Sequence, residues 1–372
     1  MGKKRRNNGE GAIYKRKDGR WCGRYANEGK RRYIYGSSRK EVAEKLFKAI
    51  SEGKNGFAFD ATGKVLMKDH LRDWLEDSVR GSVSVRTYER KEEIIRLHIV
   101  PSLGNKKLKN LSPNDLQRLY REKLDSGLAS RTVNQIHRTL NGALNEAVKW
   151  RIIPYNVCSV VTPPKCIGNE MNVLTLEQVE QLLDSAKGDR FEALYALAVT
   201  TGMRRGELLG LKWEDVDMNV STVRVKRSLV LIRAGLVFVP PKSAKSRRSI
   251  TLTSGVVESL KKHKAYQDEE RLGKRWRENS LVFPTTVGTP IYPHHFVRRY
   301  FKELLKKANL PDVRFYDLRH TCATLLLTKG VHPKIVQELL GHSSISITLD
   351  TYSHVLPNMQ EKAVRAMEDI LE

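Results

Sequence analysis

The sequence is poor in cysteine and in acidic side chains, and it has no long apolar run. Its 372 residues include four cysteines that form no Cys-x-x-Cys pair: Cys22, Cys158, Cys166 and Cys322. Four scattered thiols argue against a disulfide scaffold and favour reduced thiols in the cytosol. No apolar run approaches the ~18 residues of a membrane-spanning helix, so we expect no membrane partner. Residues 1–6 lack an apolar core, which argues against a secretory signal.

The shortage of acidic residues leaves a large positive charge. The chain has 67 lysines and arginines against 42 aspartates and glutamates, which gives a net charge of +25 and a pI near 9.9. This excess favours a polyanionic partner, most simply nucleic acid, over a merely soluble cationic surface. With 40% hydrophobic residues the chain can bury a proper core, and its length suggests two or three domains.

Residues 1–60 predict a small, basic domain. They contain 17 Lys and Arg against 7 Asp and Glu, a net charge of +10. Strand-like runs at 11–15, 21–25 and 31–35 are separated by turn residues, and 39–50 has the apolar spacing of a helix. Basic residues alternate with Tyr and Trp along the strands, which suits a β-sheet laid into a DNA groove. A solvated module with a charged face is the alternative.

After a linker, residues 64–160 predict a helical bundle. Ser84 begins one helix, and Ser112 followed by Pro113 begins another, because Ser caps a helix and Pro fits its first position. The longest apolar periodicity covers residues 131–150. Several basic residues either face a phosphate backbone or are solvated, and both interpretations stay open: Arg86, Arg90, Arg131, His137, Arg138 and Lys149.

A larger domain, residues 170–372, opens at a capping box that begins with Thr175. Within it, Gly202 breaks a helix and Arg204 begins the next one. A helix start and a guanidinium together favour a phosphate, although an exposed helix start is an equal alternative. Glu207 lies one turn further on and can orient an arginine.

Two strands at 220–227 and 229–239 are followed by a basic segment, residues 241–252, which we expect to form a hairpin. A lysine on a mobile hairpin tip can protonate a leaving oxygen, and Lys242 and Lys245 are the candidates. A simple Ser- and Lys-rich turn is the alternative.

Residues 314–329 predict a helix with Tyr316 and Arg319 on one face. Arg319 can join Arg204 in a clamp, in which each guanidinium group binds two phosphate oxygens. Another apolar helix ends at Gly341, a residue that favours the left-handed cap, and His342 follows. Tyr352 comes ten positions later. A phenol with an ordinary pKa near 10 is a poor nucleophile unless cations gather around it, so the clamp is expected to activate this tyrosine.

Together these motifs resemble the signature of the tyrosine recombinase (phage integrase) family. The resemblance covers residues 170–372 as the catalytic domain. Residues 64–160 are similar to the family's core-site-binding domain, and residues 1–60 to the arm-site-binding domain of integrases from phages and conjugative transposons. The matching segments are TGMRRGELLGLKW with Arg204, PPKSAKSRR with Lys242, YDLRHTCAT with Arg319, LLGHSS with His342 and TYSH with Tyr352.

The resemblance implies an α+β multidomain fold. It comprises a three-stranded sheet with a helix, a helical bundle, and a mainly α catalytic domain with a small antiparallel sheet. The implied function is site-specific integration and excision of a mobile element, without a cofactor or a metal.

The implied chemistry assigns a role to each matching residue. Tyr352 would attack a scissile phosphate and form a 3′-phosphotyrosyl link, which a 5′-hydroxyl of a partner duplex would later reverse. Arg204 and Arg319 would stabilise the phosphorane. Lys242 would protonate the leaving 5′ oxygen, and His342 would donate a hydrogen bond to the phosphate.

One position departs from the family pattern, because Tyr316 stands where the family usually has histidine. A tyrosine hydroxyl can donate a hydrogen bond to phosphate but is a poor base at neutral pH. We therefore expect Tyr316 to keep a hydrogen-bonding role. We expect the neighbouring His320 to point elsewhere on the helix, so the group that deprotonates Tyr352 stays unassigned.

The expected partners are double-stranded DNA, at core and arm attachment sites, and further copies of the chain. Residues 359–371 carry apolar side chains at helical spacing, and by resemblance this tail joins protomers into a tetramer on DNA. A tail that folds back onto its own protomer is the alternative. An excisionase and a host DNA-bending protein are further partners that the resemblance suggests. A type IB topoisomerase-like relaxer and a DNA-binding regulator with an inactive site are the competing functions.

Overall fold

The computed structural model describes residues 12–16, 19–27, 30–39, 41–43, 45–46, 64–166, 171–241, 246–273, 275–352, 364 and 367–371. The chain divides into two compact units, Met1–Ile167 and Gly168–Glu372. Within the described residues, no helix is both long and apolar enough to cross a lipid bilayer.

The first unit begins with a three-stranded antiparallel sheet, as predicted. Strands β1 (Ala12–Lys15), β2 (Trp21–Asn27) and β3 (Lys30–Gly36) pair in that order. One face packs on Val42, since a Cβ added to Gly23 would lie only 2.9 Å from a methyl group of that valine. The other face leaves three aromatic rings exposed: Tyr14, Tyr33 and Tyr35. Of the helix predicted at 39–50, residues 47–50 lie outside the described residues.

A helical bundle with its own apolar core follows in the same unit. Ser84 accepts a hydrogen bond from the Thr87 backbone N–H, and Ser112 forms a capping box with Asp115, so both predicted helix starts are confirmed. The core includes Leu71, Trp74, Ile99, Leu116 and Leu140. The helices are α2 (Met67–Asp73), α3 (Val85–Ile94), α4 (Val100–Leu103), α5 (Pro113–Asp125) and α6 (Ser130–Lys149). Short turns of π-helix (Trp74–Val79, Ile95–Ile99) and 3-10 helix (Leu108–Asn110, Val157–Val160) link or extend them.

The second unit is mainly helical. Thr175 forms the predicted capping box with Gln178 at its first helix. The helices are α7 (Leu176–Ser185), α8 (Glu192–Thr201), α9 (Arg205–Leu209), α10 (Ser254–Arg271), α11 (Pro293–Phe296), α12 (Lys302–Lys307), α13 (Asp317–Thr328), α14 (Pro333–Leu340) and α15 (Ile345–Tyr352). A 3-10 turn (Trp213–Asp215) and a π-helical turn (Val297–Phe301) complete them.

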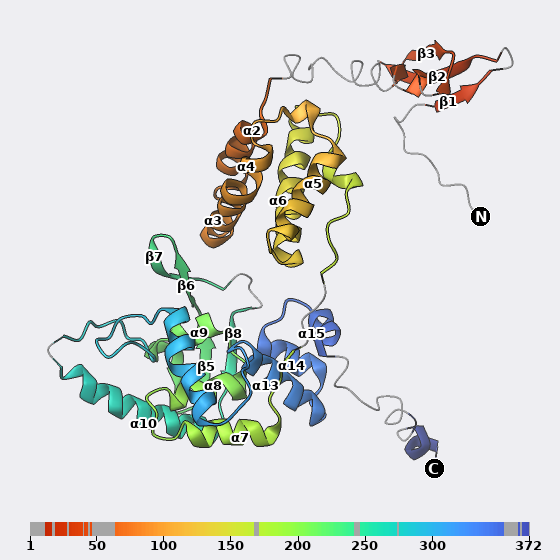
Figure 1. Ribbon diagram of the computed structural model, residues 1–372. Helices are drawn as coiled ribbons and strands as arrows, with labels where there is room; N and C mark the ends of the chain where they lie inside the picture. The colour runs from red at the N-terminus through yellow and green to blue at the C-terminus, as the bar shows by residue number, and fades with distance from the viewer. Residues whose placement is uncertain are drawn as a thin grey trace. The chain divides into compact units, whose positions relative to one another are not determined.

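The strands of the second unit form a small antiparallel sheet and a hairpin. The sheet has the order β4 (Val216–Asp217), β5 (Thr222–Val225), β8 (Arg248–Thr251). The hairpin pairs β6 (Ser228–Ile232) with β7 (Gly235–Val239) and projects from the unit (Figure 1). The expected hairpin at 241–252 differs from this arrangement: its described second half is β8, which pairs with β5 so that Ile250 and Val223 are buried opposite each other.

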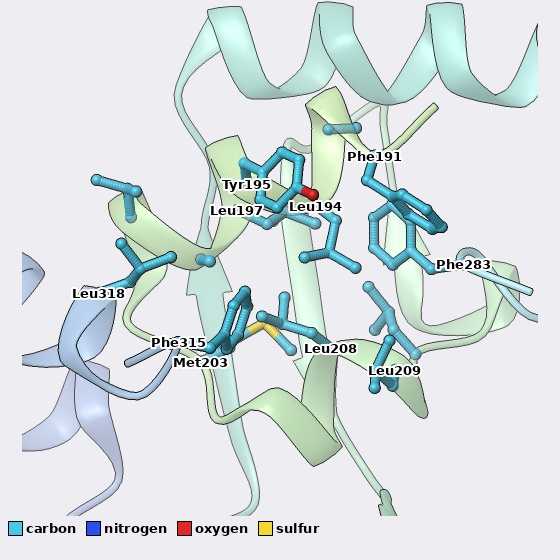
Figure 2. Close-up of a cluster of buried hydrophobic side chains, with 14 of the residues drawn as sticks. Phe191, Leu194, Tyr195, Leu197, Met203, Leu208, Leu209, Phe283, Phe315 and Leu318 are labelled. Atoms are coloured by element: carbon cyan, nitrogen blue, oxygen red, sulfur yellow. The ribbon is translucent and has the colours of Figure 1, made fainter. Parts of the chain in front are cut away.

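The main core of the second unit fixes the start of α13. Figure 2 shows Phe191, Tyr195, Phe283 and Phe315 among the side chains that fill this core. The Phe315 ring meets the ring of Phe301 edge-on, with centroids 5.1 Å apart. Because Phe315 lies two residues before α13, its burial anchors the start of the helix that carries Arg319 and His320.

A smaller apolar cluster joins α13, α14 and α15, the helices drawn in blue in Figure 1. It consists of Ala323, Leu327, Val336, Leu340 and the ring of Tyr352. Gly341 ends α14 with a positive φ of 67°, so the predicted left-handed cap is confirmed. The described part of the C-terminal tail, by contrast, exposes its apolar side chains: Val364, Met367, Ile370 and Leu371.

Candidate active site

Arg204 stands at the N-cap of α9, where the sequence places it. The preceding Gly202 ends α8 in the left-handed conformation with φ of 60°, and a Cβ there would lie 2.5 Å from Leu340 Cδ2. The tight turn therefore requires glycine, because any side chain would clash with α14. It brings Arg204 within 3.4 Å, Nη2 to O, of the Gly341 carbonyl.

Glu207 is a buried carboxylate that holds two arginines. It accepts hydrogen bonds from Nη1 of Arg204 at 2.8 Å and from Nη2 of Arg248 at 2.9 Å. Burial alone would raise the pKa of this carboxyl, but Arg248 and then Arg204 outweigh it, and the net effect lowers the pKa. The prediction that Glu207 orients an arginine fits this geometry.

Sequence reasoning missed Arg248. Its side chain is 6% exposed, and its Nε donates a hydrogen bond of 2.6 Å to the Leu339 carbonyl at the end of α14. A signal was present in the strand alternation, because Arg248 shares a face with the buried Ile250. An arginine on a buried strand face needs a carboxylate, and Glu207 supplies it.

Arg319 is almost fully buried beneath the site, with 2% of its surface exposed. Its Nη1 donates a hydrogen bond of 2.8 Å to the Gly202 carbonyl, which joins it to the turn that carries Arg204. Within the described residues, its Nε and Nη2 have no hydrogen-bond partner. Burial, together with the nearby charge of Arg204, lowers the pKa of Arg319 to about 10, so the side chain keeps its charge at neutral pH.

Tyr316 and Arg319, predicted to share one helical face, differ in exposure. Tyr316 precedes the first turn of α13 as its N-cap and is 47% exposed, whereas Arg319 is buried. Tyr316 has helical backbone dihedrals, and its carbonyl accepts a hydrogen bond of 3.2 Å from the Arg319 backbone N–H. Its ring meets the His320 ring edge-on, with centroids 5.1 Å apart.

His320 does not point away from the nucleophile, contrary to expectation. Its Nδ1 lies 2.8 Å from Oη of Tyr352, in hydrogen-bond contact. Neighbouring helical side chains diverge by about 100°, which is why Arg319 and His320 meet different groups. Sequence alone did not show that α15 would lay the Tyr352 ring on the His320 side of α13.

The Tyr352 side chain is 1% exposed. Burial raises the pKa of its phenol, and the positive charge of Arg319 partly opposes that rise. Before DNA binds, the hydroxyl is therefore protonated at neutral pH.

His342 follows the Gly341 cap and lies at the same site. Its Nδ1 is 2.9 Å from Oγ1 of Thr348, and its carbonyl accepts a hydrogen bond from the Gln337 side chain. Burial, with the charges of Arg319 and Arg204, lowers the pKa of His342 to about 4. The imidazole is thus neutral at pH 7. Lys242 and Lys245, the candidate proton donors, lie outside the described residues.

The site thus joins a protonated tyrosine, three arginines and two neutral histidines, an arrangement suited to a nucleophile directed at a phosphate. Comparison with known sequences agrees with that chemistry. The family described as Phage integrase family matches residues 172–359, and the Phage integrase, N-terminal SAM-like domain matches residues 67–124.

Whole-length relatives extend the match. The chain is 32% identical over 361 residues to a Tyrosine recombinase XerC-like protein of Caldanaerobacter subterraneus subsp. tengcongensis, covering 91% of this chain and 92% of that protein. It is 26% identical over 288 residues to the ICEBs1 integrase of Bacillus subtilis, covering 76% and 78%. The chain therefore belongs to the phage integrase family, and it is a tyrosine-type site-specific recombinase.

Solved structures share the fold. The Tn1549 transposon integrase in complex with a circular intermediate DNA has a TM-score of 0.70 at 22% identity, covering 82% of this chain and 99% of that one. A lambda integrase tetramer bound to a Holliday junction has a TM-score of 0.57 at 21% identity, covering 90% and 96%. The predicted fold class is confirmed.

Proposed function

We propose that this chain integrates and excises a mobile DNA element by cutting and rejoining DNA through a 3′-phosphotyrosyl intermediate. Buried Arg319 is the observation that carries the proposal. Its Nε and Nη2, which lack partners within the described residues, form one edge of a guanidinium fork beside the tyrosine hydroxyl. A buried donor pair left unsatisfied is costly, and two oxygens of a scissile phosphate satisfy it bidentately.

The proposed reaction conserves the energy of the phosphodiester bond in a phosphotyrosyl bond. Oη of Tyr352 attacks the phosphorus, the bond to the 5′ oxygen breaks, and Lys242 gives that oxygen a proton. Arg204 and Arg319 stabilise the negative charge that builds on the phosphorane. A 5′-hydroxyl of a second duplex then attacks the phosphotyrosine and releases Tyr352, so no nucleotide hydrolysis is needed.

His342 and Tyr316 complete the phosphate contacts in this proposal. His342 uses Nδ1 on Thr348, which leaves its other ring nitrogen for a phosphate oxygen. The Tyr316 side chain is half exposed beside the site, where its hydroxyl is accessible to DNA. Both side chains contribute hydrogen bonds to the phosphate but no positive charge.

The three proposed domains divide the DNA between them. Residues 1–60 bind arm sites through the open face of the first sheet, where exposed tyrosines lie beside Arg16 and Arg24. Residues 64–160 bind the core site, and residues 170–372 catalyse. The net charge of +25 makes binding salt-dependent, and each neutralised phosphate adds about 0.9 to the log–log slope.

The proposed assembly is a tetramer on DNA. The exposed apolar residues of the tail, Val364, Met367, Ile370 and Leu371, suit a docking helix that joins one protomer to the next. An excisionase and a host DNA-bending protein are proposed as accessory partners, by analogy with the family alone.

A nicked suicide duplex tests the cleavage. Its short 5′ product diffuses away, so the covalent protein–DNA adduct accumulates and is seen as a shifted band after denaturation. We expect the wild-type chain to form this adduct and Tyr352→Phe to form none. Adduct formation by Tyr352→Phe would show that a different residue is the nucleophile.

The same substrate separates the competing functions. A DNA-binding regulator yields no adduct from the wild-type chain. A topoisomerase-like relaxer forms the adduct but does not join two separate duplexes. We expect joined duplexes, detected as recombinant junctions by sequencing.

A further inference from the structure

The proposed strand exchange requires an acceptor for the Tyr352 proton. We propose that His320 is the catalytic proton acceptor for Oη of Tyr352, an assignment that rests on the proposed function. Nδ1 of His320 lies 2.8 Å from that oxygen. A general base must lie within ~2.6–3.2 Å of the atom whose proton it removes, so the contact already has the required length.

The other candidate acceptors at the site are engaged or unsuitable. Nδ1 of His342 lies 2.9 Å from Oγ1 of Thr348, and the proposed function assigns its other ring nitrogen to the phosphate. Both carboxylate oxygens of Asp317 accept hydrogen bonds from the Arg314 side chain, at distances of 2.8–3.1 Å. A phenol such as that of Tyr316 is ordinarily no better a base than the phenol it would deprotonate.

The surroundings of His320 keep its ring neutral and able to accept a proton. Burial lowers the pKa of His320, Asp317 opposes this effect, and Arg319 and Arg314 add to it. The neutral ring with its proton on Nε2 presents a lone pair on Nδ1, to which the phenol O–H donates. The groups that face or influence this ring come from α13, α15 and the ends beside them: Tyr316, Asp317, Arg319, Arg314, Tyr352 and His342.

The proton and the bonds balance in one step. As Oη bonds to phosphorus, its proton passes to Nδ1 and His320 becomes an imidazolium. The bond from phosphorus to the 5′ oxygen breaks, and Lys242 protonates that oxygen. In the reverse step, the imidazolium returns its proton to Oη as the phosphotyrosine bond breaks.

His320→Asn is the direct test. Asparagine keeps a hydrogen-bond acceptor near the Nδ1 position, but its amide does not take up a proton. We expect single-turnover cleavage of the nicked duplex to slow by ~100-fold or more, with unchanged DNA binding and unfolding temperature. His332→Asn is the matched control. That substitution keeps an N-cap at α14, where His332 accepts a hydrogen bond from the Lys334 backbone, and it should cleave at the wild-type rate.

A substrate with sulfur in place of the scissile 5′ oxygen separates base from acid. A thiolate leaves without protonation, so this substrate should restore cleavage by Lys242→Ala. It should not restore cleavage by His320→Asn, because the phenol still has to lose its proton. Rescue of His320→Asn would place His320 at the leaving group and overturn the proposal.

The wild-type pH profile provides a test that does not depend on a variant folding. His320 must be neutral to act, so the cleavage rate should fall as the pH drops through a value below 6.5, the ordinary histidine pKa. Absence of that acid limb overturns the proposal. So does a His320→Asn variant that cleaves as fast as wild type while Tyr352→Phe is inactive, and that result leaves the proposed function standing.

Discussion

The carboxylate of Glu207 accepts a 2.9 Å hydrogen bond from Arg248, and both side chains are at most 6% exposed. The same carboxylate also binds Arg204. The position of Arg204, a proposed phosphate ligand, therefore depends on Arg248, an arginine to which the sequence analysis assigned no role. A buried pair of this kind contributes little net stability, but it is costly to break on one side only.

Glu207→Gln should destabilise the catalytic unit by about 3–5 kcal/mol, because it leaves Arg248 buried without a counter-charge. Urea unfolding measures the loss. Adding Arg248→Met to the same chain should recover much of it, since the unpaired charge is then gone. The control is Lys262→Met, which breaks an exposed pair with Glu258 and should leave stability unchanged. A double variant no more stable than Glu207→Gln would contradict this account.

Replacing either Arg204 or Arg319 by lysine should slow cleavage by ~10²–10³-fold with little effect on DNA affinity. Arg204→Lys and Arg319→Lys keep the charge but lose the planar fork that takes two phosphate oxygens. Single-turnover adduct formation provides the readout. Arg190→Lys is the matched control, because Arg190 pairs with Glu270 rather than with the site, and wild-type cleavage is expected from it. A fully active Arg319→Lys would rule out a bidentate role.

Tyr316→Phe should reduce the cleavage rate by several-fold, up to about tenfold, since one hydrogen bond to phosphate contributes ~0.5–1.5 kcal/mol. The ring, and with it the edge-on contact to His320, is retained. Tyr292→Phe removes a hydroxyl from another exposed tyrosine and serves as the control. Equal rates for Tyr316→Phe and wild type would mean that Tyr316 has no part in phosphate binding.

The helical bundle should lose stability in acid through Asp115. Burial raises the pKa of this carboxyl, but hydrogen bonds from Lys106 and Ser112 outweigh that effect and lower the pKa to about 2 from an ordinary 3.8. Its contribution is therefore complete above pH 3.8 and is lost as the pH falls toward 2. Asp115→Asn should be less stable than wild type at pH 6, and the gap should narrow by pH 3 in thermal unfolding. Asp125→Asn, at the exposed end of α5, is the control for removing a carboxylate from the same helix.

Removing residues 1–60 should weaken recombination between sites that carry arm sequences and spare cleavage at the core site. Arg24→Ala, a single change on the open face of the first sheet, should weaken arm-site binding in the same direction. Fluorescence anisotropy with arm-site and core-site duplexes separates the two effects. Loss of core-site cleavage in the truncated chain would refute the proposed division of domains.

Local signals allowed much of the fold to be predicted from the sequence. The caps at Ser84 and Thr175 and the glycine at 341 depend on hydrogen bonds within a few residues, so short-range patterns are enough. The order of Arg204, Arg319, His342 and Tyr352 likewise follows from matching motifs.

Long-range packing was not predictable in the same way. The partner of Tyr352 depends on where α15 crosses α13, and the partner of Glu207 depends on β8 pairing with β5. The segment 241–252 has the composition of a turn. The alternation of Arg248 and Ile250 favours a strand in its second half, but only the burial of Ile250 against Val223 identifies β5 as the partner strand, and local spacing does not encode that partner.

The hydrogen bond from Arg248 to the Leu339 carbonyl connects β8 to the last turn of α14. In the sequence, Lys242 lies shortly before Arg248, and His342 lies shortly after Leu339. A substitution of Arg248 that removes this hydrogen bond should therefore disturb the turn at Gly341, which precedes His342, as well as β8.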